Sequence, residues 1–217
     1  MDDFLKERLI KYDTWLERKQ ISFSSKIIPL NKSLSAQQWV LPSEQVLKIL
    51  RNAQSVAVQK CGCRLHYSRC DNPLEVCFVL NKLAELSIAK GRARPISISE
   101  AMDIFHKSDE NGLIHLTLYQ PDHEIYALCN CCPCCCHDLL LMKICDRRDL
   151  IAHSEYVAVT NMESCNNCGK CIQRCIFEAR TLNNNRMQYN SNLCLGCGLC
   201  STICEVNATV MMPRNPQ

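Results

Sequence analysis

The N-terminal part of the chain alternates apolar and charged positions with the period of an α-helix. Within residues 2–19 the apolar side chains recur at three- and four-residue spacing opposite a charged face, which predicts an amphipathic helix. A second helix is predicted to start at Pro42, since apolar positions recur in the same way after it. The apolar positions are Phe4, Leu5, Leu9, Tyr12, Trp15 and Leu16 in the first helix and Val46, Leu47, Ile49 and Leu50 in the second.

Strand patterns follow in the middle of the chain. Residues 55–59 (SVAVQ) alternate and are rich in valine, so we expect a strand that leads directly to Cys61. Residues 113–119 and 124–129 are predicted to pair as a hairpin, with a turn at 120–123. The remaining predicted elements are a short strand over 78–80 and helices over 82–90 and 137–151.

One further helix is predicted from its end signals. Ser97 and Glu100 have the spacing of a capping box, so a helix is expected from there to about Asn111. Gly112 supplies the stop, because glycine readily adopts the left-handed conformation that ends a helix. With the strands above, this predicts an α+β class for the chain.

Cysteine usage changes this ordinary picture. The chain of 217 residues contains 19 cysteines, with none before Cys61, and the last eight lie between Cys165 and Cys204. We therefore predict a cysteine-rich α/β domain over 1–155 and a compact module over 156–217. The apolar share of 47% and the charged share of 22% are those of a globular chain, which excludes a disordered one.

The cysteines are expected to be metal thiolates and not disulfides. The N-terminus is charged and has no apolar core of a secretory signal, and no apolar stretch approaches the ~18–20 residues that span a bilayer. We therefore expect a cytoplasmic, reducing environment, where disulfides are rare. An odd number of thiols and runs of adjacent cysteines argue in the same direction, because adjacent Cα atoms lie too close for an unstrained bridge.

The charge and the remaining motifs exclude several functions. A net charge of +3 is too mild to indicate a nucleic-acid partner. The sequence contains no P-loop, no dinucleotide-binding glycine motif and no HExxH metalloprotease motif. Nothing in it identifies a substrate, and the oligomeric state stays open.

Eight cysteines near the C-terminus form an internal repeat. The spacing C-x2-C-x2-C-x3-C occurs from Cys165 to Cys175 and again, 29 residues later, from Cys194 to Cys204. A tight loop with this spacing can bring three thiolates to three irons of one cubane, while the fourth points towards another cluster. Paired zinc sites are the alternative, because C-x2-C pairs also suit zinc.

These repeats resemble the bacterial two-cluster ferredoxins over about 160–212. The resemblance implies a ferredoxin-like module that holds two 4Fe–4S clusters with exchanged fourth ligands. Ile176 and Glu205 stand where the family usually has proline, which affects the local turns but not the ligands. The implied ligands are Cys165, Cys168, Cys171 and Cys204 for one cluster and Cys194, Cys197, Cys200 and Cys175 for the other.

Ten more thiols in two groups favour one or two further iron–sulfur clusters. A zinc site and free thiols remain alternatives, and the first four of these cysteines could close a site on their own. Adjacent members of the second group cannot all face one site, since side chains in an extended segment alternate. The ten are Cys61, Cys63, Cys70, Cys77, Cys129, Cys131, Cys132, Cys134, Cys135 and Cys136.

Two segments in this region are distinctive, C-x-C-R at Cys61 and CNCC-x-CCC at Cys129. With them, residues of about 40–136 resemble the cysteine-rich N-terminal part of ferredoxin-domain iron–sulfur proteins of anaerobes. Leu41-Pro42 and the segment from Gly112 to His115 add to this resemblance. The resemblance transfers architecture and implies little about activity.

Some residues beside the cysteines are candidates for supporting roles. Arg64 could stabilise an anionic cluster or form a surface salt bridge. His66, His115 and His137 could ligate iron or carry protons, although a hydrogen-bonded structural role is favoured for each. Cys145 is expected to be a small apolar side chain in a helix. The basic residues that could together dock an acidic partner are Lys170, Arg174, Arg180 and Arg186.

The sequence therefore predicts an iron–sulfur protein that relays single electrons between a redox partner or oxidoreductase subunit and an N-terminal cluster. It favours a carrier over an enzyme, so no catalytic residue is assigned. Two alternatives remain. One is a reductive enzyme whose N-terminal cluster has an open iron site, and the other is a redox-responsive regulator.

Overall fold

A computed structural model describes residues 1–28, 31–32, 40–41, 44–121 and 124–214. Its largest unit is a sheet of seven strands in the order β6-β4-β5-β8-β7-β1-β9. Every neighbouring pair is antiparallel except β1 and β9, which are parallel. The strands are β1 (Ser25–Ile28), β4 (Val56–Lys60), β5 (Glu75–Leu80), β6 (Ala93–Pro95), β7 (Ile114–Tyr119), β8 (Ile125–Cys131) and β9 (Ile151–Ala152). The protein is thus a mixed helix-and-sheet structure, as predicted.

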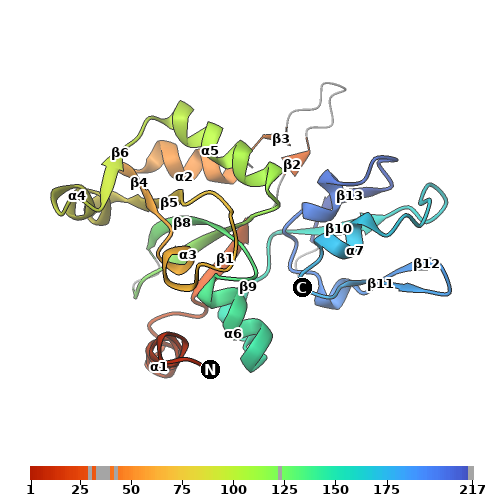
Figure 1. Ribbon diagram of the computed structural model, residues 1–217, viewed down its shortest axis with the longest axis horizontal. Coiled ribbons are helices and arrows are strands. Elements are labelled where there is room, and N and C mark those ends of the chain that lie inside the picture. Colours follow the sequence, from red (N-terminus) through yellow and green to blue (C-terminus); the bar gives the residue numbers. More distant parts are fainter. Residues whose placement is uncertain (29–30, 33–39, 42–43, 122–123, 215–217) are drawn as a thin grey trace.

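Two helices, α2 (Glu44–Asn52) and α5 (Ile98–Glu110), cover one face of this sheet (Figure 1). Phe105 of α5 stacks on Phe78 of β5, with ring centroids 4.8 Å apart, and both side chains are fully buried. The α5 helix begins as predicted, because the Ser97 hydroxyl accepts a hydrogen bond from the Glu100 N–H at 3.1 Å.

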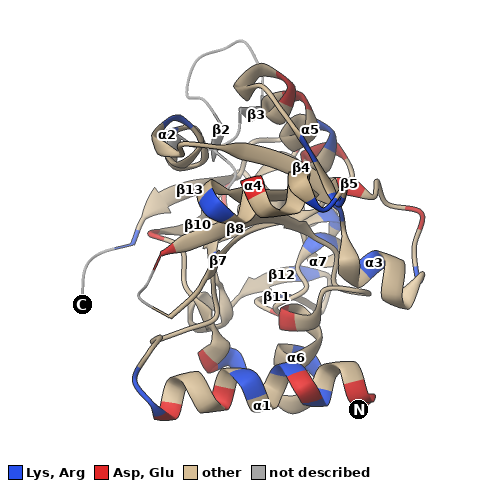
Figure 2. Ribbon diagram, turned by 90° about the vertical axis from the view of Figure 1, so that its left-hand side faces the viewer, with Lys and Arg blue, Asp and Glu red and all other residues tan. Residues whose placement is uncertain are grey.

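The opposite face carries α1 (Asp3–Glu17) and α6 (His137–Cys145), as Figure 2 shows below the sheet. Leu5 and Tyr12 of α1 are buried against the core, whereas Asp3, Lys6 and Glu7 of the same helix are exposed. Two further helices lie next to the strands of the large sheet, α3 (Gly62–Tyr67) and α4 (Asn81–Ala89). The cysteine-bearing segments lie on this side of the sheet.

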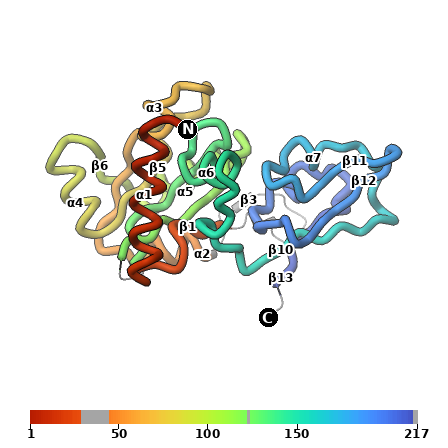
Figure 3. Tube along the Cα trace, turned by 90° about the horizontal axis from the view of Figure 1, so that it is seen from below, coloured from red at the N-terminus to blue at the C-terminus, as the bar shows by residue number. Residues whose placement is uncertain are grey.

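The C-terminal part consists of two strand pairs and two short helices. Strand β10 (Tyr156–Thr160) pairs with β13 (Thr209–Pro213), and β11 (Arg180–Asn183) pairs with β12 (Arg186–Tyr189). Helices α7 (Lys170–Arg174) and α8 (Leu199–Thr202) each follow a glycine with positive φ, as a tight turn requires. Figure 3 shows this part on the side of the molecule next to α6.

The C-terminal part shares its apolar core with the N-terminal part. Phe177, Leu195 and Leu199 belong to the same buried cluster as Leu139 and Leu140 of α6. The two segments that the cysteine pattern separates are therefore in direct contact.

Some elements differ from those predicted. The helix after the crowded cysteines ends at Cys145 and not at 151, because Asp146 adopts a left-handed conformation with φ of 53°. A short 3₁₀ helix, Arg148–Leu150, follows it. The predicted helix start at Pro42 and half of the predicted turn at 120–123 fall on residues outside the described ranges. Within those ranges, no helix is long and apolar enough to cross a membrane.

Candidate metal centres

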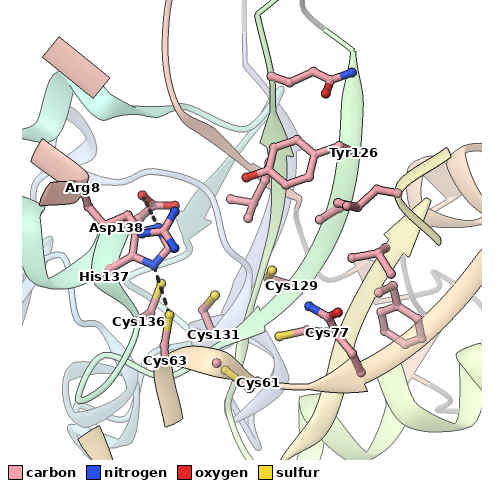
Figure 4. Close-up of a pocket in the computed structure, with 18 of the residues that line it drawn as sticks. Arg8, Cys61, Cys63, Cys77, Tyr126, Cys129, Cys131, Cys136, His137 and Asp138 are labelled. Atoms are coloured by element: carbon pink, nitrogen blue, oxygen red, sulfur yellow. Dashed lines mark hydrogen bonds and ion pairs between the residues drawn. The ribbon is translucent and has the colours of Figure 1, made fainter. Parts of the chain in front are cut away.

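The ten N-terminal cysteines divide into a group of six and a group of four. The six lie around a cavity on the α1 side of the sheet (Figure 4), which Cys132 of the other group also lines. We call them the thiol ring: Cys61, Cys63, Cys77, Cys129, Cys131 and Cys136.

Strand pairing brings the thiol ring together. Cys77 of β5 and Cys129 of β8 are partners in the sheet register. Cys131 lies two residues further along β8, so it points to the same face as Cys129. Cys61 follows β4 and caps α3, whose first turn contains Cys63, and Cys136 precedes α6.

The thiols of the ring are hydrogen-bonded to one another and cannot all ionise in the absence of a cation. Hydrogen bonds from Cys63 and Cys77 lower the pKa of Cys61, whereas the bond to Cys61 raises the pKa of Cys63. In the same way, the pKa of Cys129 is lowered by its bond with Cys131, and that of Cys131 is raised by its bond with Cys129. Metal binding would relieve this conflict, since a metal centre stabilises thiolates.

The cavity beside the ring has a volume of about 570 Å³. Side chains of α1 line one side of it, including Phe4, Arg8, Lys11 and Trp15. The two basic residues give this side positive charge, and burial next to Arg8 lowers the pKa of Lys11. Tyr126 lines the cavity from β8, and its pKa is raised by burial and by the nearby Cys129. The space therefore combines soft sulfur donors with cations.

His137 connects the thiol ring to a buried polar group. Its Nδ1 lies 3.1 Å from the Cys63 sulfur, and its Nε2 lies 2.7 Å from the Tyr12 hydroxyl. The Asp138 carboxylate is 3.3 Å from the same Nε2 and is buried. Burial and the charge of Asp138 raise the pKa of Tyr12 well above its usual value. This arrangement can hold or move a proton beside the ring.

The other two candidate histidines do not belong to the ring. His115 lies on the opposite face of β7, where Asp109 Oδ1 is 2.5 Å away and Asn130 is its second partner. His66 stacks on Phe4 with a centroid distance of 4.4 Å. For His115 the favoured hydrogen-bonded role matches the contacts observed.

The remaining four N-terminal cysteines form a separate group, which we call the four-thiol site. All four Sγ atoms lie within 4.8 Å of one another. Cys70 follows α3, and the others come from the turn between β8 and α6. The members are Cys70, Cys132, Cys134 and Cys135. The structure thus places Cys70 with the cysteines of this turn, and not in one four-cysteine group with Cys61, Cys63 and Cys77.

Arg64 lies between the two N-terminal groups. It is only 2% exposed, and its Nε donates to the Cys132 sulfur at 3.4 Å. Its other nitrogens donate to the carbonyls of Pro73 and Asn130. Although burial opposes its charge, the Cys132 thiol raises the pKa of Arg64, with Cys61 and Cys131 contributing. The guanidinium thus faces thiols, and within the described part of the chain it forms no salt bridge.

The C-terminal cysteines also gather in fours, across the two repeats. Cys165, Cys168 and Cys171 line a small cavity of about 20 Å³ together with Cys204 of the other repeat. In the second group, burial and the neighbouring thiols Cys200, Cys175 and Cys194 raise the pKa of Cys197 well above its usual value. Each set contains three cysteines of one repeat and one of the other.

Arg180 lies between these two sets, a position that the sequence pattern does not reveal. It is 2% exposed, donates to the Thr160 hydroxyl at 2.9 Å and lies 3.9 Å from the Cys171 sulfur. Burial opposes its charge, but Cys200 and Cys171 raise its pKa. Its Nη2 is buried without a hydrogen-bond partner among the described residues, so it can donate to an anionic group at either set.

The two C-terminal sets differ in their surroundings. Cys175 and Cys197 pack against the core cluster that also contains Cys131 and Cys136 of the thiol ring. Cys168 of the other set is exposed. One set therefore faces the N-terminal part and the other faces the surface.

Cys145 belongs to none of these groups. It is partly buried against the core at the end of α6, and its sulfur lies 3.4 Å from that of Met1. This agrees with the predicted role as a small apolar side chain.

Comparisons with known proteins support the prediction that the C-terminal part binds iron–sulfur clusters. Residues 187–209 match the 4Fe-4S binding domain family. Over 82 residues, or 37% of the chain, the sequence is 28% identical to hydrogenase-4 component A of Escherichia coli (strain K12). The chain matches 40% of the length of that relative. The protein thus carries a 4Fe–4S-binding, ferredoxin-like segment, whereas the resemblance of the N-terminal region stays a prediction.

Proposed function

We propose that the protein transfers single electrons through two C-terminal 4Fe–4S clusters to a further iron–sulfur centre in the thiol ring. The proposal rests on the order in which the cysteine groups lie in the structure. An exposed set of four cysteines is followed by a second set, whose members share a core cluster with the ring. Iron–sulfur clusters supply one-electron chemistry over a wide range of potentials.

The C-terminal sets fit such clusters. Cys165, Cys168, Cys171 and Cys204 are proposed to hold one, and Cys194, Cys197, Cys200 and Cys175 the other. The buried Arg180 between them has an unsatisfied donor and would compensate the negative charge of thiolate-bound iron. Gly196 is needed for this packing, because a Cβ there would lie 2.0 Å from the Tyr156 carbonyl oxygen.

The thiol ring fits an additional centre. Six thiols exceed the four that a cubane needs, and Arg64, Arg8 and Lys11 supply positive charge around them. His137 can donate to or accept from the Cys63 sulfur at 3.1 Å, which would orient that ligand.

The electron partner is proposed to be another oxidoreductase subunit. The similarity to a protein named as a hydrogenase component supports this class of partner. The surface around the exposed Cys168 is the proposed docking point, since the cysteine set that contains Cys168 faces the surface. Lys170, close to Cys168 in the chain, forms an ion pair with Glu205. The proposed docking therefore does not depend on an unpaired basic side chain at this position.

Metal analysis of anaerobically purified protein tests the proposal. At four irons per cubane, we expect about eight irons and eight acid-labile sulfides from the C-terminal clusters and about twelve of each with one cluster in the ring. Reduction should titrate as separate one-electron steps. Protein that contains zinc in place of most of the iron would overturn the electron-transfer function.

The cavity supports a second candidate, a reductive enzyme. A space of about 570 Å³ adjoins the ring and contains the side chains of Arg8 and Lys11. If one iron of the ring centre lacks a thiolate, a small anionic substrate could reach it from this space. An electron relay alone needs no such cavity.

Small ligands distinguish the two candidates. Cyanide added to the reduced full-length protein should change the electron paramagnetic resonance signal of the ring centre only if that centre has an open iron. In that case Arg8→Met should weaken the effect, and Lys6→Met, on the same helix but paired with Asp3, should not. An unchanged spectrum favours the closed relay.

A further inference from the structure

We propose that the four-thiol site binds a single zinc ion, separate from the iron–sulfur centres, and that this zinc is structural. The ligands are Cys70, Cys132, Cys134 and Cys135.

The sulfur spacing is that of four ligands on one ion. With Zn–S bonds of ~2.3 Å, tetrahedral geometry places sulfur atoms ~3.8 Å apart. Cys70 Sγ lies 3.7 Å from Cys132 Sγ and 3.9 Å from Cys135 Sγ, and Cys134 Sγ lies 3.7 Å from Cys135 Sγ. In a cubane each thiolate binds its own iron, which holds the sulfurs farther apart. The four-thiol site therefore has room for one ion and not for a cluster.

The four-thiol site adjoins the thiol ring at Cys132, which also lines the cavity of the ring. Cys131, the last residue of β8, and Cys136, the N-cap of α6, line the cavity of the ring. The turn between them brings the sulfur atoms of Cys132, Cys134 and Cys135 within 4.8 Å of the Cys70 sulfur. The crowded cysteines are thus divided between two adjacent centres.

The surroundings suit a closed structural site. Cys132 and Cys135 are buried, and four protein thiolates fill all tetrahedral positions. A zinc ion with four thiolates carries a net charge of about −2, because each thiol loses its proton on binding. Arg64 offsets part of that charge through its hydrogen bond to Cys132 at 3.4 Å.

The proposed zinc would link two segments that also build the ring. Cys70 lies after α3, which begins next to Cys61, and the other ligands lie between Cys131 and Cys136. One ion therefore fixes the distance between the two sides of the ring. The assignment to zinc follows from its preference for tetrahedral thiolate sites and for structural roles.

Metal counts on variants test the proposal. Full-length protein from cells grown with iron and zinc should contain one zinc per chain. Cys134→Ala and Cys70→Ala should lose that zinc and retain the iron count, and Cys145→Ala, which removes a thiol outside all groups, should retain both. Loss of about four irons from Cys134→Ala, or retention of zinc in both site variants, would overturn the assignment.

X-ray absorption at the zinc edge provides a test that needs no variant. We expect four sulfur neighbours at ~2.3 Å and no nitrogen or oxygen ligand. A mononuclear iron in place of zinc, or zinc with any non-sulfur ligand, would refute the proposed site. Because this measurement uses the unaltered chain, a folding defect in a variant cannot obscure the result.

Discussion

Two buried arginines are the residues through which the protein controls charge near its thiols. Arginine is seldom buried, because desolvating its charge is costly unless it is paired. Arg64 and Arg180 are each 2% exposed, and each has a sulfur atom as a partner. A guanidinium beside a thiol favours its thiolate form, which is the form that a metal ligand requires.

Replacing Arg180 by methionine is expected to lower the reduction potentials of both C-terminal clusters. Reduction adds negative charge, which the guanidinium stabilises, so its removal disfavours the reduced state. Two unit charges ~8 Å apart at an effective dielectric constant of ~20 interact by about 2 kcal/mol, on the order of 100 mV for one electron. Redox titration followed by electron paramagnetic resonance gives the shift. Arg186→Met, at an exposed position of β12, is the matched control, and equal shifts in the two variants would contradict the role of Arg180.

At the scale of the elements, the sequence predicts those helices and strands whose residue pattern lies within one segment of the chain. The long amphipathic helix α1, the capped helix α5 and the β7–β8 hairpin were all predicted, because their patterns lie within one segment. Strand β1 was missed, since its four residues pair with the distant β7 and β9. Helix α3 was also missed, because six residues carry too little periodicity.

The same distinction applies to the sites. The cysteine spacing of the C-terminal repeats predicts iron–sulfur binding directly from the sequence. Residues 187–209 match a 4Fe-4S binding domain family. The division of the N-terminal cysteines depends on the register between Cys77 and Cys129, which no local pattern encodes. The sequence places Arg180 among the basic residues that could dock an acidic partner, and this is wrong because packing between the repeats buries it.

The cap of α5 leads to a prediction about stability. Ser97→Ala removes the hydroxyl that accepts from the Glu100 N–H, and the exposed position adds no packing loss. We expect the free energy of unfolding to fall by about 1 kcal/mol, and the unfolding temperature by roughly 2–4 °C. Circular dichroism of the metal-loaded protein on heating measures this. Ser97→Asp should retain most of the stability, because aspartate caps a helix as well as serine does; a Ser97→Asp variant as unstable as Ser97→Ala would contradict the capping explanation.

The paired repeats lead to a prediction about ligand exchange. Cys204→Ala should damage the cluster of Cys165, Cys168 and Cys171, although Cys204 belongs to the other repeat, because these four line one cavity. Cys200→Ala should damage the other cluster. Electron paramagnetic resonance of the reduced variants separates the two signals. If Cys204→Ala and Cys200→Ala affect the same cluster, ligation is local to each repeat and the exchanged assignment fails.

At the scale of the whole molecule, the centres have a direction from surface to interior. The exposed Cys168 marks the outer set, while Cys175 and Cys197 of the inner set share a core cluster with the ring residues Cys131 and Cys136. A protein donor is too large for the cavity beside the ring, so in the proposed relay it would dock at the outer set. A small reductant can enter that cavity directly.

This difference in access gives a prediction for the route of electrons. In Cys165→Ala, which lacks a ligand of the outer cluster, reduction of the ring centre by a reduced ferredoxin should become much slower than in the unaltered protein, whereas reduction by dithionite should change little. Rapid mixing followed by freezing and electron paramagnetic resonance measures both rates, and Cys145→Ala controls for the loss of a thiol outside all groups. If the ferredoxin reduces the ring centre equally fast in both variants, electrons enter elsewhere. The outer set would then be a branch and not the first step, and the docking edge would have to be sought beside the ring itself.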